Sequence, residues 1–92
     1  MKVVRMIQVN DVVVVLTQRS RHHYCCYFKA DALPTEDEAV QKVSELEAKH
    51  GRKGFDSYIR PTPMRKRDAV KKFNNLVKII PNIEFYDTPT KR

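Results

Sequence analysis

Two runs of β-branched residues open the chain, and their pattern predicts a β-hairpin. The runs cover residues 3–9 and 12–17 and are separated by Asn10 and Asp11, which both tolerate the positive φ of a two-residue type I′ turn. Both faces of this hairpin are mainly apolar, so we expect it to lie centrally in a sheet or to have one face covered by a partner. Pairing outward from the turn sets six residue pairs opposite one another, with Val9–Val12, Ile7–Val14 and Arg5–Leu16 on one face, and Gln8–Val13, Met6–Val15 and Val4–Thr17 on the other.

Three further segments have the composition of strands. Residues 22–29 follow a polar turn at residues 18–21, and we expect them to extend the antiparallel meander. Residues 54–60 end at Pro61 and are predicted to form another strand, and residues 83–86 are predicted to form a short final one.

The first helix is predicted from residue 35 onward by its capping signals. Thr35 and Glu38 have the spacing of a capping box, and acidic residues occupy the first turn, where the helix dipole favours them. Lys49 and His50 fall in the expected last turn, and Gly51 is placed to end the helix. A narrow apolar stripe consists of Ala39, Val40, Val43 and Leu46.

The second helix is predicted by a regular 3.6-residue apolar stripe. We expect it to begin with Thr62 as the cap or just after, with Pro63 in the first turn, and to stop at Pro81. The stripe consists of Ala69, Val70, Phe73, Leu76, Val77 and Ile80. The residues expected to point away from it are Arg67, Lys71, Asn75 and Lys78.

The predicted order of elements is β-β-β-α-β-α-β, which indicates an α+β fold. We expect a mostly antiparallel sheet with both helices packed on one face. Ninety-two residues allow one domain, residues 1–92, with residues 88–92 expected to fray.

The net charge of +7 is unevenly distributed along the chain. Residues 31–50 carry six acids and two lysines, whereas residues 51–78 carry nine Lys and Arg residues and two acids. A surface of one sign attracts polyanions, and nucleic acid is the commonest of these.

The basic cluster at residues 65–67 is the strongest functional candidate. Arg65, Lys66 and Arg67 fall at or near a helix start, where the dipole favours acids, and such a local conflict is expected where function overrides stability. A solvated helix face would explain the later lysines of this helix but explains this cluster poorly. The phosphate contacts predicted in this region are Arg52, Lys53, Arg60, Arg65, Lys66, Arg67, Lys71 and Lys78.

A second basic and aromatic group falls in the turn before the third strand. Arg19, Arg21 and Tyr24 are predicted as an additional contact, since arginine and tyrosine stack on unpaired bases; cross-strand packing is the alternative. The chain is therefore predicted to be a small nucleic-acid-binding protein, with RNA or single strands slightly favoured, binding mainly through phosphates and with limited sequence reading.

Catalytic and metal-binding motifs are not evident in the sequence. His22, His23, Cys25 and Cys26 alternate between the two faces of a strand, so each face offers two ligands where a structural zinc needs four. The cysteines are expected to be buried, reduced thiols. We expect no cofactor and no enzymatic activity, although a small ribonuclease without a recognisable motif stays open.

An alternative function is a compact inhibitor or adaptor that docks on an acidic protein or blocks a nucleic-acid-handling enzyme. A phage accessory or counter-defence protein has this size and charge. A homodimer is also expected, through an uncovered apolar sheet face or through acidic and basic helices of two copies. The longest apolar run has five residues and the N-terminus does not resemble a signal peptide, so we expect a soluble, cytoplasmic chain without membrane contact.

Overall fold

The computed structural model describes residues 1–48 and 61–80 of the chain. These residues form three strands and two helices: β1 (Lys2–Val9), β2 (Val12–Arg19), β3 (His22–Lys29), α1 (Glu36–Ala48) and α2 (Lys66–Ile79). The α+β class is confirmed, as are the first three strands and both helices. The strands predicted at 54–60 and 83–86, and the frayed end predicted at 88–92, lie outside the described residues.

The three strands form an antiparallel sheet in the order β1-β2-β3. Five of the six predicted pairs between β1 and β2 are confirmed, and the sixth is wrong because the register shifts between Val3 and Arg5. Val3, rather than Val4, lies opposite Thr17, and Val4 is the extra residue of a bulge, with 44% of its surface exposed. Asn10 has a φ of 59°, whereas Asp11 has no positive φ, so the two-residue turn is not the predicted type I′.

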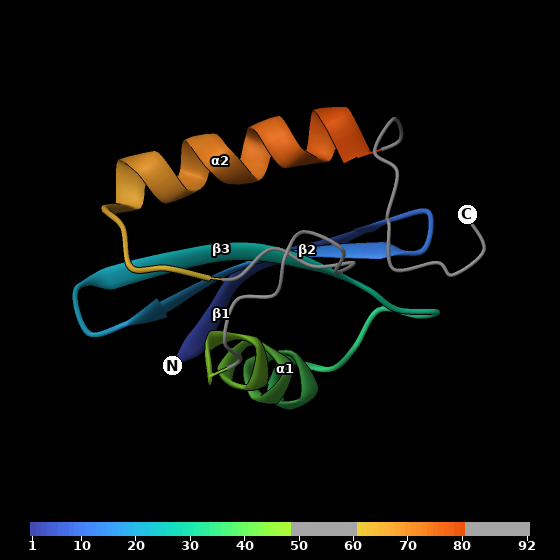
Figure 1. The fold of residues 1–92 in the computed structure, drawn as a ribbon, viewed down its shortest axis with the longest axis horizontal. Coiled ribbons are helices and arrows are strands. Elements are labelled where there is room, and N and C mark those ends of the chain that lie inside the picture. Colours follow the sequence, from blue (N-terminus) through green and yellow to red (C-terminus); the bar gives the residue numbers. More distant parts are fainter. Residues whose placement is uncertain (49–60, 81–92) are drawn as a thin grey trace.

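The two helices cover opposite faces of the sheet, so the prediction that both pack on one face is wrong (Figure 1). Successive side chains of β2 alternate between the faces, and every residue from Val12 to Thr17 is at most 2% exposed. The apolar character of both hairpin faces therefore reflects a central strand that is buried on both sides.

Each helix packs against its own half of the hydrophobic core. On the α2 side, the buried core residues are Val12, Val14, Leu16, Cys25, Ala69, Phe73, Leu76 and Ile80. On the α1 side, they are Val13, Val15, Cys26, Phe28, Ala39, Val43 and Leu46.

The capping box predicted for α1 is present. The Glu38 backbone N–H donates to Thr35 Oγ1 at 3.2 Å, and the Thr35 N–H donates to Glu38 Oε1 at 3.0 Å. These two bonds satisfy backbone groups that would otherwise lack partners, and so define where the helix begins. Lys49, His50 and Gly51, predicted for its end, lie outside the described residues.

Helix α2 begins at Lys66, later than predicted from Thr62 and Pro63. The delay has a local cause, because Met64 and His23 exchange two backbone hydrogen bonds of 2.9 Å and hold the chain extended beside β3. Arg65 then occupies the N-cap with φ −72° and ψ 154°, and its side chain makes no capping hydrogen bond.

Candidate nucleic-acid interface

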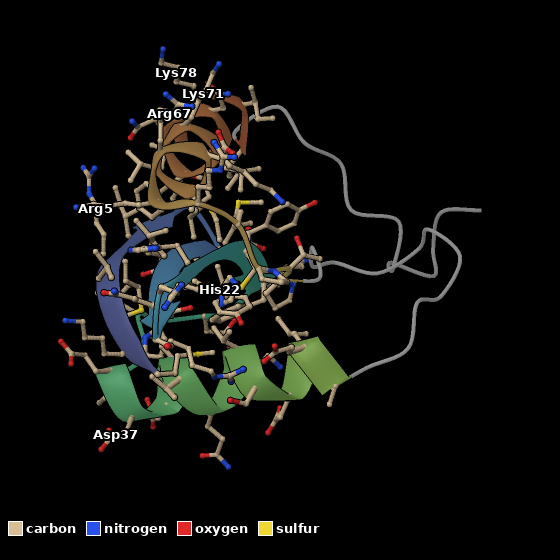
Figure 2. The ribbon with its side chains drawn as sticks, turned by 90° about the vertical axis from the view of Figure 1, so that its left-hand side faces the viewer. Arg5, His22, Asp37, Arg67, Lys71 and Lys78 are labelled. Carbon is tan, nitrogen blue, oxygen red and sulfur yellow. The ribbon has the colours of Figure 1, made fainter. Side chains whose placement is uncertain are left out.

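The outward side of α2 presents a row of cations. Arg67, Lys71 and Lys78 are exposed and point away from the sheet (Figure 2). They occupy this side because the apolar stripe of the helix is buried against β2 and β3. We call these three residues the basic face; its position on the helix agrees with the predicted helical wheel.

The N-terminal end of α2 adds two further cations. Arg65 and Lys66 are exposed beside Arg67, and Asp68 is the single acid in the first turn. The helix start therefore has one acid where α1 has three, and it lacks a side-chain cap, although its positive dipole end favours anions. Bases at a helix start that favours acids are the local conflict expected from the sequence. Five of the predicted contact residues thus lie on α2 and its N-cap: Arg65, Lys66, Arg67, Lys71 and Lys78.

Arg5 of β1 extends the basic face and was missed in the sequence. Its guanidinium carbon lies 5.0 Å from the centroid of the Phe73 ring, and the residue is exposed next to α2 (Figure 2). The predicted pairing of Arg5 with Leu16 already placed it on the same face as Ile7 and Val14. This register shows which face of the sheet Arg5 occupies. Its place beside the basic face depends in addition on α2, which covers that face.

Arg21 lies in the turn between β2 and β3, near the segment that leads into α2. It is exposed and stands two residues before His23, whose backbone bonds to Met64. The backbone bridge between His23 and Met64 thus brings this turn close to the segment that leads into α2 (Figure 1).

Arg19 and Tyr24 lie on the α1 side of the sheet and serve a structural purpose. The Arg19 guanidinium donates to both carboxylate oxygens of Glu47, at 3.1 and 3.3 Å, and lies 5.5 Å from the Tyr24 ring centroid. The hydrogen bond and charge of Glu47 raise the pKa of Arg19. Tyr24 is only 5% exposed, so its ring is not accessible for base stacking, and cross-strand packing is the better interpretation.

The remaining predicted contacts, Arg52, Lys53 and Arg60, lie outside the described residues. The described part of the site therefore consists of α2, its N-cap, Arg5 and Arg21.

Acidic residues gather on the layer opposite the basic face. Helix α1 carries five acids and one lysine, whereas α2 carries five bases and one acid. Asp37 and the basic face lie at opposite ends of the molecule, with the sheet between them (Figure 2). The fold thus separates the two signs of charge in space, with an acidic α1 layer and a basic α2 layer.

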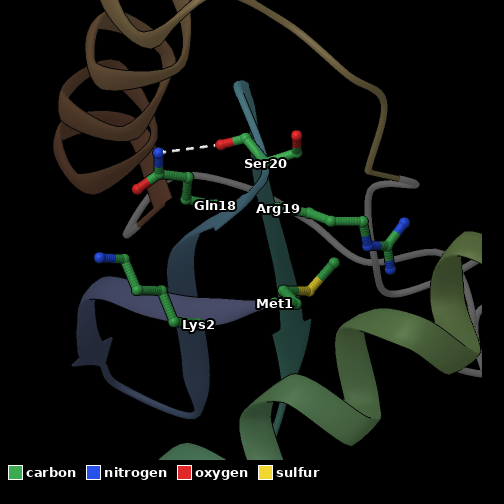
Figure 3. Close-up of a pocket in the computed structure, with 5 residues that line it drawn as sticks. All are labelled: Met1, Lys2, Gln18, Arg19 and Ser20. Atoms are coloured by element: carbon green, nitrogen blue, oxygen red, sulfur yellow. Dashed lines mark hydrogen bonds between the residues drawn. The ribbon is translucent and has the colours of Figure 1, made fainter.

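An open depression of about 370 Å³ lies near the start of β1 and the end of β2 (Figure 3). It is lined by Met1, Lys2, Gln18, Arg19 and Ser20. The Gln18 side-chain amide donates to the Ser20 carbonyl at 3.1 Å, and Arg19 is paired with Glu47. The polar lining residues are Lys2, Gln18, Arg19 and Ser20.

The cysteines are buried thiols on opposite faces of β3. Burial raises the pKa of Cys25 to about 11 and, together with the charge of Cys25, that of Cys26 to about 12, while the Lys72 charge acts to lower both. Within residues 1–48 and 61–80, no three His, Cys, Asp or Glu side chains come together in a way that could hold a metal ion.

Two polar atoms of the described residues are buried without a hydrogen-bond partner. These are Thr17 Oγ1, on the α1 side of β2, and His23 Nδ1, on the α2 side of β3. Such atoms lose hydration on folding without a compensating bond, which is a cost to stability.

Comparison with known proteins gave no match to any family model, curated protein or solved structure. None of the helices in the described part of the chain is long and apolar enough to cross a membrane.

Proposed function

We propose that this protein binds nucleic acid through the α2 layer, mainly by contacts to phosphates. The observation that carries this proposal is the separation of charge between the two outer layers of the fold. An even distribution of surface charge is expected of a merely soluble protein, whereas a concentrated positive surface attracts a polyanion.

The contact residues proposed for this interface are the exposed cations of α2 and its N-cap, with Arg5 beside the helix and Arg21 in the turn near the segment that leads into it: Arg65, Lys66, Arg67, Lys71, Lys78, Arg5 and Arg21. Arg19 and Tyr24 are left out, because the first is paired with Glu47 and the second is buried. The base stacking suggested for Arg19 and Tyr24, which would favour RNA or single strands, is therefore not part of this proposal.

Fluorescence anisotropy is the direct test of this proposal. Single-stranded RNA, duplex RNA and duplex DNA of matched length would be titrated with the protein at low and physiological salt. We expect binding that weakens with salt yet persists at physiological salt for at least one of the three ligands. Weak binding that disappears equally for all three would count against the proposal and direct attention to an acidic protein partner.

A pair of charge-matched variants makes the test specific to the basic face. The first variant replaces Arg67, Lys71 and Lys78 with glutamine. The second adds three glutamates to the exposed side of α1, by Gln41→Glu, Ser44→Glu and Ala48→Glu, so both have a net charge of +4 instead of +7. We expect only the first variant to lose binding; equal losses would show that total charge, and not the basic face, controls affinity.

A further inference from the structure

We propose that α2 is a DNA-reading helix, which lies in the major groove of duplex DNA and contacts base edges through Asn74 and Asn75. This inference rests on the proposed function, since it specifies the nucleic acid bound at the same surface.

Asn74 and Asn75 lie in the middle of the exposed side of α2. They follow Lys71 by three and four residues and precede Lys78 by four and three, and these spacings place neighbours on one helical surface. Both asparagines are exposed. The outward surface of the helix is therefore a row of cations with primary amides at its centre.

Two consecutive asparagines are unfavourable in the interior of an exposed helix. Asparagine has a low helix propensity, because its amide competes for backbone hydrogen bonds outside the helix. Neither residue caps α2, which continues to Ile79, and neither belongs to the buried core. A local loss of helix stability that no packing or capping contact offsets is expected where a side chain serves binding.

The chemistry of an exposed amide suits adenine. An Asn side chain donates to N7 and accepts from the N6 amino group of adenine, and both atoms line the major groove. Lysine and arginine residues on either side of the amides can contact the phosphates or guanine bases that flank such a site.

The shape of the interface favours a duplex of the B form. Helix α2 is about 21 Å long and about 10–12 Å across with its side chains, and the major groove of B-DNA is about 12 Å wide. The major groove of duplex RNA is too deep and narrow for side chains to read. The described sheet cannot act as a platform for single strands either, since helices cover both of its faces (Figure 1).

The experiment uses a 20-base-pair DNA duplex in which adenine and guanine alternate on one strand, so that any register presents adenine to the helix. A second duplex carries 7-deazaadenine at every adenine, which removes the N7 acceptor and leaves the phosphates and base pairing intact. The same sequence as an RNA duplex and as single strands completes the set. All are titrated with the full chain by anisotropy at one salt concentration.

We expect the DNA duplex to bind at least about tenfold more tightly than the RNA duplex, and 7-deazaadenine to weaken DNA binding about fivefold. In the double variant Asn74→Ala, Asn75→Ala, the 7-deaza effect should disappear, while the salt dependence of binding stays unchanged because no cation is removed. Alanine favours the helix, so this variant should fold, and circular dichroism would check that it does.

The possible failures separate the two proposals. Equal binding of normal and 7-deaza DNA, or RNA binding as tight as DNA binding, would overturn the major-groove model while leaving nucleic-acid binding intact. The absence of binding to every ligand would overturn both.

Discussion

Neutralising the basic face should change how binding depends on salt, and the size of that change follows from the structure. Each phosphate that a cation neutralises releases counterions, so the logarithm of the binding constant falls with the logarithm of salt by about 0.9 per contact on duplex DNA. Arg67, Lys71 and Lys78 are exposed along one side of α2, and each can neutralise one phosphate. Replacing all three with glutamine should therefore make the salt dependence shallower, with the magnitude of the slope reduced by about 2.7.

This difference is large enough to measure. When salt is raised from 50 to 200 mM, the fold-loss of affinity should be about 40 times smaller for the variant than for the wild type, because their slopes differ by about 2.7. Anisotropy titrations at four salt concentrations in this range would give both slopes. The variant itself should fold, because its three side chains lie outside the core.

The control is the α1 variant with Gln41→Glu, Ser44→Glu and Ala48→Glu, which has the same net charge. Its slope should remain that of the wild type, because the number of cations that meet phosphates is unchanged. Our reasoning would be refuted by an unchanged slope in the α2 variant, or by an equal fall in both variants.

Four further predictions concern the core and the charges around the site. Thr17→Val should raise stability by about 1 kcal/mol, because it removes a buried hydroxyl without a partner; thermal denaturation would show a higher midpoint, and a lower one would contradict this. Phe73→Ala should destabilise by about 3–5 kcal/mol in urea denaturation, because the ring is 1% exposed between α2 and β2; a loss below about 1 kcal/mol would mean that α2 is not docked there. Asp68→Asn should tighten DNA binding about twofold at low salt by removing the one acid of α2, and weaker binding would argue against contacts at this helix. Burial raises the pKa values of Cys25 and Cys26 from 9.0 to about 11 and about 12, so the folded state holds their protons more strongly than the unfolded state. The stability that these two thiols contribute should therefore be fully present below about pH 9 and be lost as the pH rises through 11 to 12. A double Cys→Ala variant whose free energy of unfolding falls equally over this pH range would contradict this origin.

Local patterns in the sequence were sufficient to predict most of the described elements. The β-branched runs around Asn10 and Asp11 predicted the hairpin and nearly all of its register, because pairing follows directly from turn length and side-chain alternation. Thr35 and Glu38 predicted the start of α1, since a capping box involves neighbours three residues apart. The predicted register was wrong only at Val4, the extra residue of the bulge, because the sequence around it carries no local signal for a bulge.

The start of α2 illustrates the limit of such local reasoning. Thr62 and Pro63 have the character of a helix start, yet Met64 is held extended by His23, which lies forty-one residues earlier in the chain. Hydrogen bonds between distant segments outweigh local propensity here, and no pattern around Thr62 announces them.

The sequence alone determined that this chain has a three-stranded meander, two amphipathic helices and a surplus of bases near the second. It did not determine which face of the sheet each helix covers, because a two-sided apolar strand fits a central position as well as a partner interface. The tertiary structure decided this by burying Val12, Val14 and Leu16 under α2 and Val13 and Val15 under α1. The placement of the two helices also determines which cations are neighbours in the candidate site. Arg5 lies beside the basic face, whereas Arg19 pairs with Glu47 on the other side of the sheet. Surface chemistry depends on which segments become neighbours, and only packing of the whole chain fixes that.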